Sequence, residues 1–219
     1  MEWDWAFVWQ IMPTLLAGLK LTLLVTLLAA VVAAVLGLAL AILRRSGNRA
    51  VARGTAALSE FIRGTPLLVQ LYFIFYVLPD IGIRLPALLA GVIGMGLHYA
   101  TYTAEVYRAG IENVPRGQWE AARATNLTMR QTWVHVIVPQ AVPPMIPVLA
   151  NYLIAMFKET PLLSAITVLE LMNQAKSVAN TYYRYIEPMT LVGVFFLAMS
   201  LVSVVFLRVL EARFGRMAK

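Results

Sequence analysis

Long runs of apolar residues, separated by short polar stretches, dominate the chain. The first run covers residues 13–43, contains Lys20 as its only charge, and exceeds the roughly 20 residues that a membrane-spanning helix needs. Four further apolar runs follow, at residues 58–78, 85–107, 139–157 and 188–210. The pattern predicts an all-α integral membrane protein with about five transmembrane helices.

Composition supports a lipid environment. Hydrophobic residues make up 60% of the 219 residues and charged residues 13%, against about 45–50% and about 25% in soluble proteins. A soluble domain of this size could not bury so much apolar surface. The length predicts a single domain over residues 1–219. The absence of cysteine excludes disulfides, thiolate nucleophiles and cysteine-based metal sites.

The net charge of +7 would suggest nucleic acid as a partner in a soluble chain. In a membrane protein, basic residues mark the cytoplasmic loops instead, so no nucleic acid is expected. Most of them lie between runs one and two, between runs three and four, and after run five. This distribution predicts an outside N-terminus and a cytoplasmic C-terminus. An odd number of spans agrees, because it places the two termini on opposite sides of the membrane. The residues concerned are Arg44, Arg45, Arg49, Arg53, Arg108, Arg116, Arg123, Arg130, Arg208, Arg213, Arg216 and Lys219.

A short polar helix is predicted between runs three and four, over residues 117–127. Pro115 and Gly117 mark its start, and Asn126 suits its end because Asn tolerates the left-handed conformation. By periodicity alone it is a solvated loop helix without a partner. The spacing of Glu120-Ala121-Ala122, residue 126 and Val136-Ile137-Val138-Pro139, however, resembles the EAA motif of ABC importer permeases. Asn126 stands in place of the motif's Gly, and the two valines replace Ile and Leu.

Further segments resemble one branch of that family, the polar amino-acid uptake permeases of the histidine and glutamine type. Residues 61–66 resemble its F-x-R-G-T-P segment, residues 102–111 its Y-x-A-E-x-x-R-x-G-I segment, and residues 151–163 its N-E-F-I-x-L-L-K-D-T-S-L region. A narrower resemblance, to permeases of ectoine and hydroxyectoine uptake, comes from residues 96–102 and 157–161.

The resemblance implies the MetI-like fold of ABC importer permeases in the bacterial inner membrane, crossing it several times. It also implies partners: ABC ATPase subunits, an extracytoplasmic substrate-binding protein, and a second copy of the permease or a homologous one. The chain contains no G-x-x-x-x-G-K-[ST] sequence, so it lacks a P-loop and is not expected to be an enzyme. ATP and Mg²⁺ are therefore expected in the partner ATPase, and no cofactor on this chain.

In this family the helix with the EAA motif docks into the ATPase and transmits its closure to the spans. Residues 117–127 would then be the coupling helix, and alternating access the mechanism. A secondary transporter or channel without ATP is the alternative, since buried charges serve it equally, but it needs no docking helix. The residues implied in coupling are Gly117, Gln118, Glu120, Ala121, Ala122 and Asn126.

Charges within apolar runs mark a candidate substrate path, because each costs about 2.5–3.5 kcal/mol at a helix centre. Arg63-Gly64-Thr65-Pro66 and Lys158-Glu159-Thr160-Pro161 combine charges with helix-breaking residues, and broken membrane helices line cavities. Two such segments suit a zwitterion, with its carboxylate near backbone N–H groups and its cationic end near Glu159. The alternative is ion pairing of Arg63 with Glu60 or Glu105.

Aromatic residues add to the path. Tyr152 follows Asn151 where many relatives carry Glu, and with Tyr99 and Tyr102 it offers ring faces to a delocalised cation such as the amidinium of ectoine. Ordinary helix packing is the alternative. His98 either makes a local hydrogen bond or contacts substrate or a proton. We expect no catalytic or metal site. The proposed path comprises Arg63, Gly64, Thr65, Pro66, His98, Tyr99, Tyr102, Asn151, Tyr152, Lys158, Glu159 and Thr160.

Overall fold

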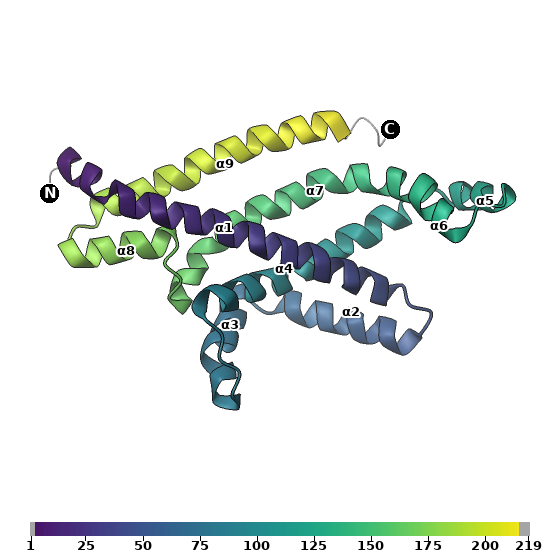
Figure 1. The fold of residues 1–219 in the computed structure, drawn as a ribbon, viewed down its shortest axis with the longest axis horizontal. Coiled ribbons are helices and arrows are strands. Elements are labelled where there is room, and N and C mark those ends of the chain that lie inside the picture. Colours follow the sequence, from purple (N-terminus) through teal and green to yellow (C-terminus); the bar gives the residue numbers. More distant parts are fainter. Residues whose placement is uncertain (1–2, 215–219) are drawn as a thin grey trace.

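The computed structural model describes residues 3–214, with the side chains of residues 211 and 214 left aside, and every regular element in this part of the chain is helical. The elements run along one long axis (Figure 1). The α-helices are α1 (Trp5–Arg44), α2 (Arg49–Gly64), α3 (Leu67–Tyr72), α4 (Ala87–Glu112), α5 (Arg116–Ala124), α6 (Met129–Gln131), α7 (Val138–Glu159), α8 (Leu171–Tyr182) and α9 (Ile186–Phe214). Two π-helical segments, Phe73–Val77 and Thr132–Ile137, and two 3-10 segments, Leu78–Ile81 and Thr160–Ile166, complete the fold.

Three segments are long and apolar enough to cross a membrane: Trp5–Arg44, Met129–Ile166 and Ile186–Leu210. The pair Arg49–Gly64 and Leu67–Ile81 makes a fourth if the two helices count as one bent span. The all-α membrane fold is therefore confirmed. The third run became α4, a helix of 26 residues that does not meet the same length and composition criteria. The count of five spans stays a prediction.

The second apolar run, residues 58–78, does not form a straight span. The chain bends by 100° between α2 and α3, at the Arg63-Gly64-Thr65-Pro66 break that the sequence predicted. Thr65 is extended and Pro66 precedes the first residue of α3, because proline has no N–H to continue the helix. Gln70 stabilises the bend, since its Nε2 donates to the carbonyls of Ile62 at 2.6 Å and Thr65 at 3.0 Å.

Small residues allow α1 and α4 to pack closely. Ala29, Ala33, Gly37 and Ala41, spaced four residues apart, are all buried. A Cβ on Gly96 of α4 would lie 2.5 Å from Cγ1 of Val32, which is too close for any side chain. The shared face expected from the spacing is therefore a helix contact.

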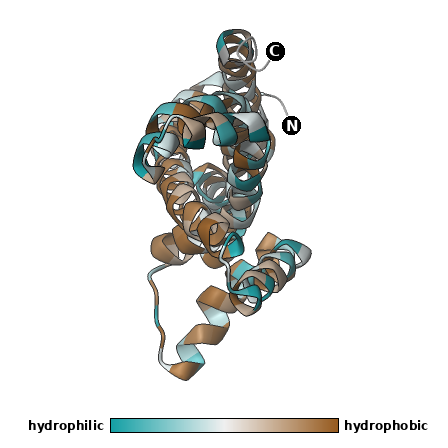
Figure 2. Cartoon of the chain, turned by 90° about the vertical axis from the view of Figure 1, so that its right-hand side faces the viewer, coloured by the Kyte–Doolittle hydropathy of each residue, from teal (hydrophilic) through white to brown (hydrophobic). Residues whose placement is uncertain are grey.

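The two ends of the molecule differ in character. Figure 1 places α5, α6 and the last turns of α1 and α9 at one end, and α8 with the start of α1 at the other. Figure 2 shows the chain from the first end, with hydrophobic colour over most helices and hydrophilic stretches toward the viewer. The basic residues that predict a cytoplasmic side belong mainly to that end, although Arg216 and Lys219 lie outside the described residues.

Candidate substrate path and coupling helix

Three tyrosines form a cluster between α4 and α7. Tyr99 and Tyr102 lie one turn apart on α4, with ring centroids 5.9 Å apart. Tyr152 of α7 faces both, at 6.2 Å from Tyr99 and 5.7 Å from Tyr102. The rings are tilted or edge-to-face, which is the favoured geometry for aromatic pairs. The structure thus brings together the three tyrosines that the sequence singled out.

A carboxylate adjoins this tyrosine cluster. The Tyr99 hydroxyl donates a hydrogen bond of 2.9 Å to Oε2 of Glu159, the last residue of α7. Tyr99 is 5% exposed, whereas Tyr102, Tyr152 and Glu159 are only partly covered. His98 lies beside the rings, 5.6 Å from Tyr99 and 5.3 Å from Tyr102. Partial exposure leaves these groups open to a ligand or a partner.

Glu105 of α4 is the centre of an ion-pair cluster. Its carboxylate pairs with Arg44 at the end of α1, with Arg63 at 3.5 Å and with Arg108 at 2.9 Å. Arg108 also reaches Glu112 at 2.5 Å. These bonds tie the last turns of α1 and α2 to α4. Ion pairing of Arg63, the alternative to a substrate contact, is thus present with Glu105. Glu60 is exposed and has no ion pair among the described residues.

The Glu105 cluster and the tyrosine cluster are neighbours. Glu105 follows Tyr102 by three residues on α4, about one helical turn. Of the three arginines, Arg63 is the one with the longest contact to Glu105. Arg63 is thus linked to the tyrosine cluster only through Glu105, whereas Glu159 contacts the cluster directly through Tyr99.

The remaining residues of the predicted path are not all gathered there. Thr65 donates to the Phe61 carbonyl at 2.8 Å, and Thr160 is buried and donates to the Phe157 carbonyl at 2.8 Å. Both hydroxyls serve local backbone. Gly64 and Pro66 form the exposed bend between α2 and α3. Asn151 and Lys158 are exposed and make no side-chain hydrogen bond or ion pair within the described part of the chain.

Two residues of this site escaped the sequence interpretation. Gln70 closes the bend and also places Oε1 3.3 Å from Nδ1 of His98. Its position shortly after Pro66 was the only sequence feature that could have indicated this role. Arg44 was counted only as a marker of membrane side. It is 61 residues from Glu105 in sequence, so no local spacing could pair them. No group of three or more His, Asp or Glu side chains suited to a metal occurs within residues 3–214.

A short helix, α5, stands where the coupling helix is predicted, with shifted bounds; its role in coupling stays a prediction. The structure begins α5 at Arg116 and ends it at Ala124, rather than at residues 117 and 127. Asn126 has φ 58°, the left-handed conformation that the sequence led us to expect there. The Leu127 N–H then bonds the Ala122 carbonyl at 3.0 Å, a helix-ending arrangement.

The α5 helix is fixed to the base of the following span. Trp119 packs edge-on against Trp133 at 5.4 Å, and Gln140 Nε2 donates to Gln118 Oε1 at 3.2 Å. Ala122 is 3% exposed, while Glu120 and Ala121 face outward. Aromatic packing and this hydrogen bond therefore join α5 to the segment that begins the following span.

Comparison with known proteins identifies the family of this chain. The family described as binding-protein-dependent transport system inner membrane component matches residues 33–216. The chain belongs to this family. It is a multi-pass inner-membrane permease subunit of the ABC transporter type and not an enzyme.

Individual relatives span nearly the whole permease. It is 44% identical to the probable amino-acid ABC transporter permease protein y4tG of Sinorhizobium fredii, over 94% of this chain and 89% of that protein. It is 33% identical to the glutamine transport system permease protein GlnP of Escherichia coli, over 97% and 98% of the two chains.

Solved structures agree on the fold. A chain from the crystal structure of an amino acid ABC transporter with histidines superposes with a TM-score of 0.90 at 35% identity, covering 97% of the permease and 100% of that chain. An inward-facing MetNI methionine ABC transporter superposes with a TM-score of 0.71 at 19% identity, covering 92% and 98%. The second likeness supports the MetI-like fold.

Proposed function

We propose that this permease forms the translocation path of an ATP-driven importer for a polar amino acid or a related zwitterion, with ectoine or hydroxyectoine favoured. The relatives named above support the amino-acid class, because their names describe amino-acid and glutamine transport. Ectoine rests on the resemblance at residues 96–102 and 157–161 and on the chemistry of the tyrosine cluster.

The observation that carries this proposal is a carboxylate beside three aromatic rings within the helical bundle. Glu159 provides the negative charge for the cationic end of a zwitterion, and the faces of Tyr102 and Tyr152 favour a flat, delocalised cation. Arg63, which pairs with Glu105 about one turn beyond Tyr102 on α4, offers a donor to the ligand's carboxylate. An amidinium such as that of ectoine fits this set better than a compact ammonium would, because its charge is spread over a plane.

The permease obtains its energy from elsewhere. In the proposed mechanism, ATPase subunits that use ATP and Mg²⁺ contact the outward face of α5 at Glu120 and Ala121. An extracytoplasmic binding protein delivers the substrate at the other end. A second copy, or a homologous permease, covers the half-exposed tyrosine cluster and completes the path. Closure of the ATPase pair moves α5, and the Trp119–Trp133 contact passes the movement to α7, which carries Glu159.

Uptake by the reconstituted complex tests the proposal. Proteoliposomes containing permease, ATPase and binding protein receive labelled ectoine, glutamine, histidine or arginine, with and without internal ATP. We expect ATP-dependent accumulation of ectoine, suppressed by unlabelled hydroxyectoine. Accumulation of glutamine in preference to ectoine would keep the amino-acid class and reject the ectoine assignment. Failure of all four with a stable complex and active ATPase would reject the class.

A further inference from the structure

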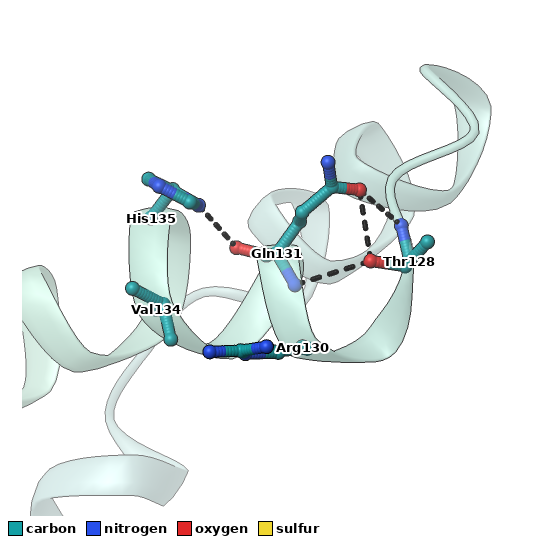
Figure 3. A pocket seen from close by; sticks show the side chains of 5 residues that line it. All are labelled: Thr128, Arg130, Gln131, Val134 and His135. Carbon is teal, nitrogen blue, oxygen red and sulfur yellow. Dashed lines mark hydrogen bonds between the residues drawn. The ribbon is translucent and has the colours of Figure 1, made fainter.

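A second polar site lies at the start of the span Met129–Ile166, away from the substrate path. It is an open pocket of about 520 Å³ between α6 and the π-helical segment Thr132–Ile137, seen from close by in Figure 3. Its lining contains one permanent cation and no carboxylate. The lining residues are Thr128, Arg130, Gln131, Val134 and His135.

Local hydrogen bonds occupy some of the polar groups that line this pocket and leave other donors without a partner among the described residues. Gln131 Oε1 accepts from the Thr128 N–H at 2.9 Å and from the Thr128 hydroxyl at 2.8 Å (Figure 3). The side-chain Nε2 of Gln131 makes no hydrogen bond within residues 3–214. His135 Nδ1 lies 3.2 Å from the Gln131 carbonyl, so one of its two ring nitrogens has a local partner. Arg130 makes no ion pair with any described residue. These groups together suit an oxyanion.

An apolar stripe continues from Arg130 along the span. Val134, Val138 and Val142 follow it at four-residue steps and are 53%, 43% and 41% exposed. Figure 3 shows the Arg130 side chain extending beside Val134. A cationic side chain followed by an exposed apolar stripe matches the order of groups at a membrane surface, where charged headgroups are followed by hydrocarbon chains. This end is also the one that we predict to be cytoplasmic.

We propose that this pocket binds the phosphate of one anionic phospholipid, whose acyl chains lie along Val134, Val138 and Val142. A free phosphate would use the donors but not the valine stripe. An ATPase contact would not require the stripe either, and α5 already presents an outward face for docking. The bound lipid would anchor the segment between the coupling helix and α7, which is where movement of α5 enters the membrane.

Native mass spectrometry of the full chain in uncharged detergent tests the lipid site. Phosphatidylglycerol and phosphatidylcholine are titrated separately onto wild type, Arg130→Gln and Arg53→Gln. Arg53 is an exposed arginine of α2 and provides the matched loss of charge. Since one basic residue near an anionic surface contributes about 1 kcal/mol, Arg130→Gln should weaken phosphatidylglycerol binding about fivefold. Arg53→Gln should retain wild-type binding, and phosphatidylcholine should bind each protein equally weakly.

Several results would overturn the lipid site. Equal losses in Arg130→Gln and Arg53→Gln would mean general surface charge. Displacement of phosphatidylglycerol by inorganic phosphate at matched charge would mean a free-anion site. Unchanged lipid binding with loss of the co-purified ATPase subunit would mean a protein-docking surface. If Arg130→Gln does not give a monodisperse protein, His135→Ala replaces it, with a smaller loss of phosphatidylglycerol binding expected and an unchanged value overturning the proposal. None of these readouts depends on transport or on its substrate.

Discussion

The Tyr99 hydroxyl donates to Glu159 across 2.9 Å and joins the middle of α4 to the last residue of α7. Tyr99 is almost completely covered, whereas Glu159 is partly open. The bond therefore orients one carboxylate oxygen and leaves the other for a second partner. Such a held but incompletely satisfied carboxylate is suited to a cationic group that arrives and leaves during transport.

Replacing the Glu159 carboxylate should weaken transport without removing the Tyr99 bond. Glu159→Gln keeps a carbonyl acceptor for the hydroxyl but removes the charge that would attract the cationic end of the substrate. We expect substrate affinity to fall about tenfold or more, measured as the concentration dependence of ATP-driven uptake in proteoliposomes. Glu60→Gln, at an exposed and unpaired carboxylate of α2, is the control and should behave as wild type. Equal uptake by both variants would exclude a substrate role for Glu159.

The tyrosine cluster should act through its ring faces. Tyr152→Ala removes a face shared with Tyr99 and Tyr102 and should lower affinity for a delocalised cation about tenfold. Tyr152→Phe keeps the ring and should retain most of the affinity. Uptake of ectoine or another amidinium ligand gives the measurement, with Tyr185→Ala, between α8 and α9, as control. A loss in Tyr152→Phe equal to that in Tyr152→Ala would point to the hydroxyl instead of the ring.

Local features of the fold were predictable from sequence because their causes are local. Pro66 interrupts a helix wherever it stands, Asn126 favours a left-handed turn, and small residues at four-residue spacing on α1 form one face regardless of what they contact. These expectations agree with the bend after α2, with φ of 58° at Asn126 and with the α1–α4 contact. Exact helix ends were less predictable, as α5 shows, since end residues depend on capping.

Long-range partners were not predictable in the same way. Arg63 could be assigned to either Glu60 or Glu105 on chemistry alone. The contact between α2 and α4, which brings Arg63 to Glu105, decides between them. Arg44 looked like a topology marker because its partner lies 61 residues away. The tyrosine cluster was anticipated residue by residue, but its contact with Glu159 depends on how α7 ends against α4, which no single-segment pattern contains.

The Glu105 cluster should contribute to stability more than a surface ion pair does. Glu105→Gln leaves Arg44, Arg63 and Arg108 without their common anion, in a setting where the carboxylate side chain is 23% exposed. We expect the free energy of unfolding to fall by about 1–3 kcal/mol, seen as a lower thermal midpoint of the detergent-purified chain. Glu112→Gln removes a half-exposed carboxylate that pairs with Arg108 alone and should cost less. Matching midpoints for the two variants would refute a central role for Glu105.

Coupling should be sensitive to the outward face of α5. Glu120→Lys reverses an exposed charge without touching the Trp119–Trp133 contact, so the permease should fold while ATP hydrolysis becomes independent of substrate and uptake falls. ATPase rates with and without loaded binding protein give the readout, and Glu60→Lys on α2 supplies the charge-reversal control. Ala122→Leu, at a buried position, should instead disturb folding of α5 itself. Normal stimulation of hydrolysis and normal uptake in Glu120→Lys would remove α5 from the coupling route.

Glu170, which precedes α8 outside the candidate spans, should make stability depend on pH. Burial raises the pKa of this carboxyl to about 7 from an ordinary 4.5, against the lowering effect of the Met172 and Asn173 N–H groups. Between these values the folded chain holds a proton that the unfolded chain has lost, so stability falls as pH rises through this window, by an amount on the order of 3 kcal/mol. Glu170→Gln keeps an acceptor oxygen but cannot ionise, and its thermal midpoint should flatten over the same range. Glu60→Gln should keep the wild-type slope; a slope that persists in Glu170→Gln would assign the titration to another group.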